Sequence, residues 1–417
     1  MIDISNNGVG AGDLYNNALR GIKARAKETY KMCEPSRQLI SQRARVVYMF
    51  SPECKSAIDR IVQGVVGQGL TCSDAAITSD LNEHIRDITG ENTIIETCKQ
   101  IIRQVILDGE AFIYIQNGYY KLLESQQIKT PAYFPRTASG YYYNPDTQNL
   151  VYGGVEIDST FGRVLGYWHK SPFHNEETVS AYTFLNASEV SHIYEPEFAN
   201  QYRGISKISN VIESLYQLAC YMQAETQAAI VGSCYSLAIT TPTKDDFMAL
   251  TGARPEIVSD GEADTGLNSI TQIQTGGIYH LRDGEKIESL QNNHVSSSFA
   301  TFREQIIKQL AMCLGIPRTI LEMDFDGTYS SSKAGSVMAN NTYKPYLKLL
   351  QNGFLSKIYG PGIQWTSSFM RSFEPIDEYS FYKTALDDGF ITKDEMALAL
   401  FGHEAVAEKP AALPLEE

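Results

Sequence analysis

The sequence predicts an α+β fold in which amphipathic helices flank a region of short strands. Apolar residues recur at helical spacing in residues 51–66, 94–107, 204–231 and 299–316. Residues 119–194 are instead rich in tyrosine, β-branched residues and turn pairs, which is typical of a strand meander. At 417 residues with 43% hydrophobic composition, the chain is long enough for two or three cores.

The first half of the chain contains two well-delimited helices and one strand. Residues 1–45 are expected to form a small, polar arm followed by a helix. Pro52 lies in the first turn of the helix over 51–66, which carries an apolar stripe. Asp108-Gly109 closes the helix over 94–107. Residues 110–115 then read as a strand that ends in a hairpin turn at Asn117-Gly118.

The second half alternates long helices with short polar segments. A helix begins after Gly204 and contains no proline before Pro242. Polar loops and short strands follow to residue 284, and Gly315 with Pro317 stops the next helix. This order predicts a small mixed insert at the end of a two-helix stalk.

A polar, acidic loop is expected between the second stalk helix and a helix over 337–350. Its two carboxylates lack further oxygen ligands at EF-hand spacing, so a solvated loop is favoured over a metal site. The serines beside Lys333 resemble Ser-x-x-Lys hydrolases, but the companion motifs are absent and a helix N-cap is favoured. The residues concerned are Asp324, Phe325, Asp326, Gly327, Thr328, Tyr329, Ser330, Ser331 and Ser332.

Composition and motifs argue against several function classes. The net charge of −14 disfavours a protein that grips phosphates over a large surface. It suits a conduit through which nucleic acid passes and an ordinary cytosolic protein equally well. The seven cysteines contain no Cys-x-x-Cys pair, so neither a disulfide framework nor a zinc knuckle is expected. A phosphate-binding Gly-x-x-x-x-Gly-Lys loop is also absent. The sequence shows neither an apolar run of about 20 residues nor a signal peptide, which predicts a cytoplasmic protein.

Isolated charged residues and histidines do not form a recognisable metal or catalytic site in the sequence. His169 with His174, or His192 with Glu195, lack a third zinc ligand, so no metal or cofactor is expected. Arg203 is expected to pair with an acid such as Glu195 or one on a neighbouring subunit, with a plain surface ion pair as the alternative. Two helical cations, Arg303 and Lys308, either balance Glu304 or meet DNA transiently on the inner wall of a ring.

Four segments together resemble the lambda type of tailed-phage portal proteins. The most specific is residues 192–206, where a His and a Pro precede Gln201, Arg203 and Gly204. Residues 276–287 are similar to the strand pair that closes the family's clip, and 314–334 to its helix end, tunnel loop and Tyr-Ser-Ser segment. Residues 374–392 resemble its C-terminal helix pair. The resemblance extends from about residue 45 to residue 404.

The resemblance implies a portal fold with a wing, a two-helix stem, a clip and a C-terminal wing or crown. The corresponding ranges are 1–45 for the arm and its helix, 46–203 for the wing, 204–231 for the first stem helix, 232–298 for the clip, 299–316 for the second stem helix, 317–335 for the tunnel loop, 336–409 for the helical wing or crown, and 410–417 for the tail. The short tail suggests that an extended crown is missing.

The resemblance also implies a function without catalysis. A dodecameric ring of identical subunits would stand at one capsid vertex of the virion, assembled in the host cytoplasm, as the conduit for double-stranded DNA. Its partners would be the terminase large subunit, a head-completion adaptor and the major capsid or scaffold protein, with no membrane. The alternatives are another structural virion protein of the capsid or tail, and a metal-dependent enzyme acting on nucleic acid.

Overall fold

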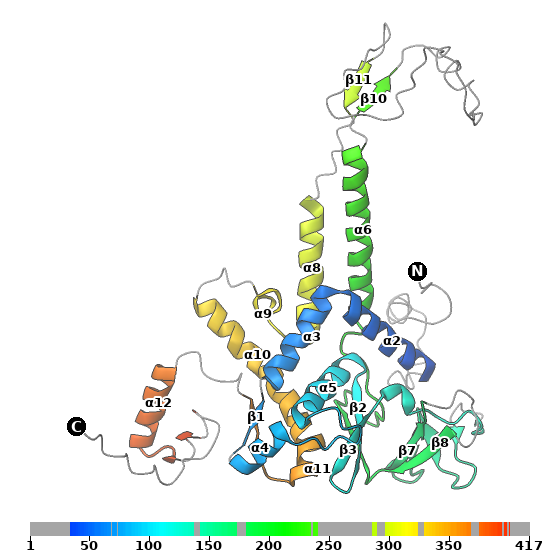
Figure 1. Ribbon diagram of the computed structural model, residues 1–417, viewed down its shortest axis with the longest axis vertical. Coiled ribbons are helices and arrows are strands. Elements are labelled where there is room, and N and C mark those ends of the chain that lie inside the picture. The colour runs from blue at the N-terminus through cyan, green and yellow to red at the C-terminus, as the bar shows by residue number, and fades with distance from the viewer. Residues whose placement is uncertain are drawn as a thin grey trace. The chain divides into compact units, whose positions relative to one another are not determined.

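The computed structural model describes residues 34–67, 69–72, 74–136, 142–172, 181–234, 237–240, 286–289, 297–323, 329–367, 375–393, 396–397 and 400 (Figure 1). The chain divides into two units. Unit 1 comprises Met1–Leu218 and Arg303–Glu417, and unit 2 comprises Ala219–Phe302. Mixed helices and strands in the described residues confirm the predicted α+β class.

A helix layer forms one part of unit 1. Its centre is α3 (Pro52–Val65) packed on α5 (Ile94–Leu107), with α2 (Glu34–Phe50) on one side and α10 (Tyr329–Leu350) on the other (Figure 1). Shorter helical segments complete the unit, namely α4 (Ala75–Glu83), the 3₁₀ turn η2 (Ser125–Gln127), α9 (Arg318–Glu322), the π segment η4 (Gln351–Leu355), α11 (Ser356–Tyr359) and α12 (Pro375–Asp387).

Local sequence explains the two central helices. The Ser51 side chain caps α3 by accepting a hydrogen bond from the Cys54 amide, and Pro52 occupies the first helical position. Thr93 and Glu96 form a capping box at the start of α5. Each helix buries a full apolar stripe, which holds them together. The predicted bounds of both helices are confirmed.

Two antiparallel sheets lie beside the helix layer. The first has the order β3-β2-β9, formed by β2 (Glu110–Gln116), β3 (Tyr119–Leu123) and β9 (Val190–Tyr194). Asn117 and Gly118 join β2 to β3 with φ of 52° and 80°, as the predicted hairpin turn requires. The second sheet runs in chain order through β4 (Tyr142–Tyr143), β5 (Leu150–Tyr152), β6 (Val155–Ile157), β7 (Val164–Lys170) and β8 (Tyr182–Asn186). The predicted meander is therefore present.

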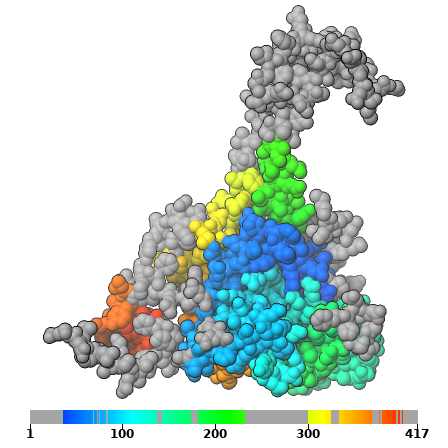
Figure 2. All heavy atoms as spheres, viewed as in Figure 1, coloured from blue at the N-terminus to red at the C-terminus, as the bar shows by residue number. Residues whose placement is uncertain are grey.

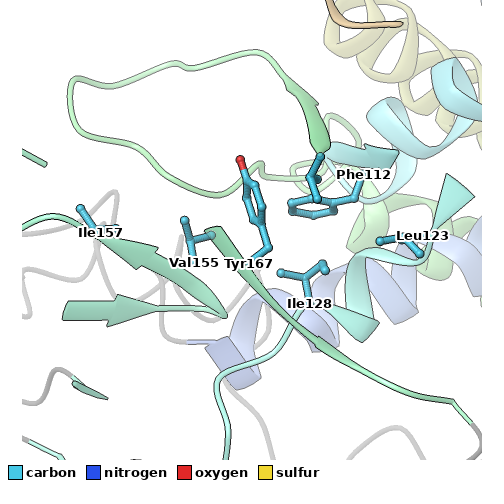
Figure 3. Packing of buried hydrophobic residues seen from close by; sticks show 7 residues of the cluster. Phe112, Leu123, Ile128, Val155, Ile157 and Tyr167 are labelled. Carbon is cyan, nitrogen blue, oxygen red and sulfur yellow. The ribbon is translucent and has the colours of Figure 1, made fainter. Parts of the chain in front are cut away.

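One apolar core joins these two sheets. Side chains from β2, β3 and β9 meet side chains from β6 and β7 in a buried cluster, whose members are Phe112, Leu123, Ile128, Val155, Ile157, Tyr167 and Val190 (Figure 3). The ring of Tyr167 meets Phe112 edge-on at a centroid distance of 5.4 Å. A third, two-stranded pairing joins β1 (Leu70–Thr71) to β12 (Thr366–Ser367).

The first long helix begins later than the sequence indicates. α6 spans Ile212–Cys234, whereas the predicted helix starts at residue 204. Residues 205–211 instead form successive turns, in which the Lys207 amide donates to the carbonyl of Ile106 over 3.0 Å. Ile208 and Val211 are buried in these turns, so their apolar spacing reflects contact with the rest of unit 1 rather than helix.

The second long helix ends as predicted. α8 spans Ser297–Leu314, and Gly315 follows with a φ of 69°. The Ile316 amide then donates to the carbonyl of Ala311 over 3.1 Å, a Schellman arrangement that needs glycine in the left-handed conformation.

Unit 2 contains α6 from Ala219 onward, α8 as far as Phe302, and a short strand pair. The ring of Tyr221 on α6 meets those of Phe299 and Phe302 on α8 at 5.3 and 5.2 Å. β10 (Leu237–Thr240) pairs antiparallel with β11 (Lys286–Ser289). Most of the predicted clip, at 241–285 and 290–296, lies outside the described residues.

The segment predicted as a long polar loop is largely helical. α9 occupies Arg318–Glu322, and α10 begins at Tyr329 rather than at residue 337. Ser330 and Ser331 therefore lie within the first turn of α10 and do not precede it as N-caps. The error has a simple origin, because serine, lysine and alanine are tolerated in a first helical turn and the apolar stripe begins only later.

Candidate functional site

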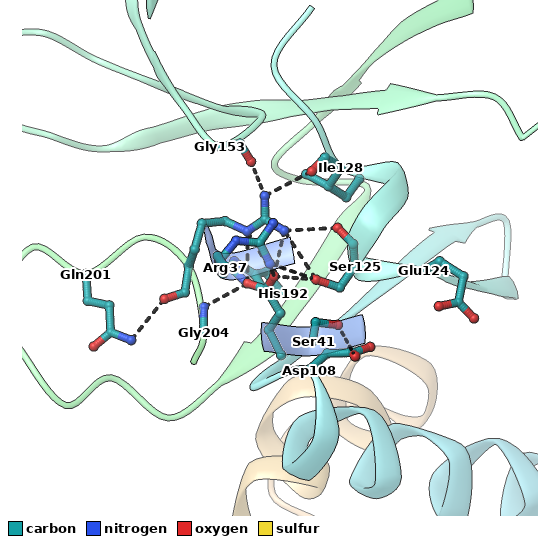
Figure 4. A network of polar contacts seen from close by, with 12 residues as sticks. Arg37, Ser41, Asp108, Glu124, Ser125, Ile128, Gly153, His192, Gln201 and Gly204 are labelled. Atoms are coloured by element: carbon teal, nitrogen blue, oxygen red, sulfur yellow. Dashed lines mark hydrogen bonds and ion pairs between the residues drawn. The ribbon is translucent and has the colours of Figure 1, made fainter. Parts of the chain in front are cut away.

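A buried carboxylate, Glu110 at the start of β2, gathers polar groups from distant parts of unit 1. Its side chain is completely buried, and the network around it is drawn in Figure 4. Arg37 of α2 donates to Glu110 Oε1 over 2.8 Å, and the hydroxyl of Ser125 donates to the same oxygen over 2.6 Å. The ring of His192 on β9 lies 3.1 Å from Oε2 through its Nε2 atom. One acid thus ties together α2, β2, η2 and β9.

Arg203, a residue of the predicted family motif, is the principal partner of Glu110. Its Nε atom lies 3.0 Å from each carboxylate oxygen, and its Nη2 atom donates to Oε1 over 2.6 Å. The guanidinium also donates to the carbonyl oxygens of Ile128, Gly153 and Ser125. Only 3% of Arg203 is exposed, so a fully hydrogen-bonded cation is fixed just before the turns that lead to α6.

Gly204 lies where only a glycine fits. Its amide donates to Glu110 Oε2 over 2.8 Å. A Cβ atom at this position would lie 2.1 Å from the carbonyl oxygen of Gly109, and Gly109 itself has a φ of 88°. The two backbones therefore pack directly against each other, which fixes the entry to α6 against the turn between α5 and β2.

Gln201, the third motif residue, shapes the loop that precedes Arg203. Its side-chain oxygen accepts from the amides of Glu197 and Phe198 over 2.9 and 3.2 Å. Its side-chain nitrogen donates to the carbonyl of Arg203 over 2.9 Å. Gln201 is 6% exposed, so this buried amide replaces backbone pairing that the loop lacks.

A neighbouring acid, Asp108, attaches α2 to the same turn. Ser41 donates to Asp108 Oδ1 over 2.5 Å, and Arg45 donates to it from Nε over 2.9 Å. Arg45 also pairs with Glu124. Arg37, Ser41 and Arg45 follow one another at intervals of four residues and so share one face of α2. That polar face, together with the buried side chains of Ile40 and Ala44, holds this part of the helix.

The charge states of this network follow from its contacts. Burial by itself would raise the pKa of Glu110, but the positive charges of Arg203 and Arg37 and the hydrogen bond from His192 hold it well below its ordinary value. Burial lowers the pKa of His192 despite its bond to Glu110. Glu110 is thus ionised and His192 neutral near pH 7, with Nε2 as the donor. A buried polar network whose charges are paired in this way rigidifies the structure around it.

These contacts correct the expected pairing of Arg203. Glu195 pairs instead with Lys207, at 2.9 Å, and Arg203 is not at the surface. One feature of the sequence points to this pairing, since Glu110 opens an otherwise apolar strand and a buried carboxylate requires a cation. His192, which was considered with Glu195 as a zinc ligand, belongs to the Glu110 network.

A second group of charges lies near the surface between α8, α9 and α3. Lys308 pairs with Glu304 at 3.0 Å, and Arg318 pairs with both Glu304 and Glu322. Arg303 lies 3.9 Å from Glu322 and 3.5 Å from Glu53 on α3, which continues the alternation of charge. These side chains, which we name the α9 ion pairs, are mostly partly exposed. The pairing of Lys308 with Glu304 favours charge balance over phosphate contact.

The remaining predicted site residues are only partly described. Asp324, Phe325, Asp326, Gly327 and Thr328 lie outside the described residues, while Tyr329 begins α10. Within the described ranges, no three His, Cys, Asp or Glu side chains gather as a metal site would need. Among the described helices, none has the length and apolar composition of a membrane span.

Comparison with known proteins gives concordant results. The family model for phage portal protein, lambda family, matches residues 15–346. A probable portal protein of Halomonas phage phiHAP-1 is 24% identical over 360 residues, which is 79% of this chain and 66% of the relative. The chain thus spans slightly less than two thirds of that relative's length.

Solved structures resemble the fold. A chain in the virion of a native gene transfer agent particle is 14% identical, with a TM-score of 0.55 over 88% of this chain and 93% of the other. A chain in the neck of the native particle, computed with C12 symmetry, also gives a TM-score of 0.55 at 14% identity, over 86% of this chain and 91% of the other. Because the family model covers most of the sequence, the protein belongs to the lambda family of phage portal proteins.

Proposed function

We propose that this protein is a portal subunit, which forms a closed ring at one vertex of a capsid and conducts double-stranded DNA during packaging and ejection. The observation that carries the proposal is the family match over residues 15–346. The order of elements supports it, because the chain leaves unit 1 on α6 and returns on α8, with unit 2 between. The twelve-fold neck of the gene transfer agent particle suggests a dodecamer.

The Glu110 network would give this ring its mechanical strength. Arg203 and Gly204 lie immediately before the turns that lead to α6, and both bind a carboxylate at the centre of unit 1. In our proposal α6 and α8 are the stem helices, and the segment between them is the clip. Force exerted on the stem by moving DNA would then pass into a fully paired, buried anchor instead of a flexible hinge.

The proposed partners follow from this arrangement. The clip would dock first the terminase large subunit and later the head-completion adaptor, and unit 1 would contact the major capsid or scaffold protein. DNA would pass through the ring transiently, and the virion would be the site of action. The chain itself would supply no chemistry.

Electron microscopy tests the proposal most directly. Negative-stain images of the purified full-length protein, with its mass in solution, are expected to show rings with a central hole. Tubes or shells would instead indicate another structural virion protein. Magnesium- or manganese-dependent cleavage of DNA by the purified chain would favour the enzymatic alternative.

The acidic loop provides a residue-level test. In our proposal Asp324 and Asp326 project into the channel and repel phosphates, so that DNA slides without adhering. The double substitution Asp324→Lys with Asp326→Lys is expected to leave ring assembly intact and to slow DNA packaging. Packaging rates would be measured with matched ring preparations. Loss of rings would show that the loop is structural and would contradict its assignment to the channel.

A further inference from the structure

Two faces of unit 1 expose apolar side chains at opposite edges of the helix layer. At one edge, the outer face of α2 presents Val46, Met49 and Phe50, which are 40%, 70% and 79% exposed. At the other edge, α10 presents Val337 and Met338, which are 55% and 64% exposed. We name these the α2 face and the α10 face. Figure 1 shows α3 and α5 between the two helices.

The spacing of its three residues makes the α2 face continuous. Positions 46, 49 and 50 lie three and four residues apart, so their side chains cover one side of α2. Arg45 precedes Met49 by one helical turn and borders this face, where it binds Asp108. Figure 2 shows α2 and α3, in blue, at the molecular surface. Exposed, contiguous apolar residues of this size mark interaction surfaces in folded proteins.

Charge also distinguishes the two edges. α10 carries three lysines and no acidic residue within its 22 residues. Two of them, Lys344 and Lys348, are exposed and have no ion-pair partner in the part of the chain that the structure describes. They follow Met338 by 6 and 10 residues, or about 9 and 15 Å along the helix.

The α2 face adjoins an acidic pocket that complements these lysines. The pocket has a volume of about 470 Å³, and Met49 forms part of its wall. Acidic residues outnumber basic residues in its lining by four to three. The acidic ones are Asp87, Glu91, Asp108 and Glu124, and the basic ones are Arg45, Arg103 and Lys121. Asp108 and Glu124 are paired with Arg45, whereas Glu91 is exposed and has no ion-pair partner among the described residues.

Ring symmetry gives these two edges a common explanation. In a closed ring of more than two subunits each contact is heterologous, so one surface must meet a different surface of the next copy. We propose, on the basis of the portal function above, that the α10 face of one subunit packs on the α2 face of its neighbour. Val337 and Met338 then cover Val46, Met49 and Phe50, while Lys344 or Lys348 enters the acidic pocket beside Glu91. The partner is a second copy of this chain.

Cysteine cross-linking tests this contact. The double variant Met49→Cys with Met338→Cys is expected to form a ladder of covalent oligomers on mild oxidation of assembled rings. A mixture of the two single variants should stop at dimers. Each single variant alone should cross-link no more than the parent chain, which controls for native cysteines such as the exposed Cys220. Strong cross-linking of Met49→Cys by itself would indicate a symmetric contact and would overturn the proposal.

Substitutions provide a second test with a matched control. Met49→Glu and Met338→Glu should each weaken ring assembly about tenfold or more, because a charge would enter a desolvated interface. Phe161→Glu should leave assembly unchanged, although Phe161 is 89% exposed, since it lies on the turn between β6 and β7 and belongs to neither face. The double variant Lys344→Glu with Lys348→Glu should weaken assembly, and adding Glu91→Lys to the same chain should restore part of it.

The outcomes separate this inference from the portal function. If the parent chain forms rings but the paired cysteines do not cross-link and Met49→Glu assembles normally, the contact is wrong and the portal function stands. If the parent chain forms tubes or shells, the portal function fails, and the contact proposed for the ring fails with it.

Discussion

The Glu110 network and the α9 ion pairs are built from the same kinds of charged side chain, but the first is buried and the second is partly exposed to solvent. Around Glu110, the carboxylate is fully buried and the side chains of Arg37 and Arg203 are 6% and 2% exposed. In the α9 ion pairs, Glu304 and Lys308 are 40% and 44% exposed. Water competes for the hydrogen bonds of the α9 ion pairs but not for those of the Glu110 network. Ion pairs with similar N–O distances therefore contribute differently to stability in the two regions.

The difference teaches which segments are fixed and which can adjust. Each buried charge depends on its partner, because removal of one leaves the other desolvated and unpaired. The entry to α6 is therefore held in one arrangement. An exposed pair can exchange its partner for water, so we expect the position of α9 to depend on ionic conditions.

Substitution of the central acid should produce the largest effect. Glu110→Gln would leave Arg37 and Arg203 buried with excess positive charge, and we expect a loss of about 3 to 5 kcal/mol in the free energy of unfolding. Urea denaturation followed by circular dichroism would measure it. The matched control is Glu304→Gln, which changes the same atoms in an exposed pair and should leave the urea midpoint nearly unchanged. Equal losses in the two variants would show that burial is not the deciding factor.

The pH dependence of stability should distinguish the two regions next. Burial lowers the pKa of His192 below 6.5, so the unfolded state binds more protons once the pH falls below that value. Stability contributed by neutral His192 is therefore present above pH 6.5 and is lost as the pH falls towards the folded pKa. The lowered pKa of Glu110 adds a further loss only below about 4.5, the ordinary value.

The variant His192→Gln isolates the histidine term. Glutamine retains a donor for Glu110 but does not titrate, so the variant should show a flatter stability curve below about pH 6.5, the ordinary pKa of histidine. Urea midpoints at several pH values would measure the slope. A curve parallel to that of the parent chain would assign the dependence to other histidines, such as His169, whose pKa is also lowered by burial.

Much of the local structure could be predicted from sequence, because the signals were local. The capped stripe of residues 94–107 matches α5, and the glycine after Leu314 matches the end of α8. The Glu110 network could not be predicted in the same way. Arg37 lies 73 positions from Glu110 and Arg203 lies 93 positions away, so no window of sequence contains the pairing.

The late start of α6 has the same physical origin. Residues 205–211 have apolar residues at helical spacing, but bonds from the Lys207 amide and the Ser206 hydroxyl to the carbonyl of Ile106 hold them in turns. Tertiary contacts thus override local preference where the chain is anchored. Local sequence gives no physical reason for the motif at 201–204, whereas the buried Glu110 explains its Arg203 and Gly204.

The smallest expected effect concerns the ionic sensitivity of α9. Its amides at Ile320 and Leu321 donate to the carbonyl of Pro317 over 3.1 and 3.2 Å, and Leu321 is its one buried residue. Raising the salt concentration to about 1 M shortens the screening length to about 3 Å, which weakens the pairs that Arg318 makes. Hydrogen-exchange protection in α9 should then fall a few-fold, roughly, while protection in β2 should not change. Arg318→Gln should lower protection at low salt and remove most of the salt dependence. If the variant retains the salt response of the parent chain, apolar packing around Leu321 positions α9, and the contrast between the two regions is one of burial alone.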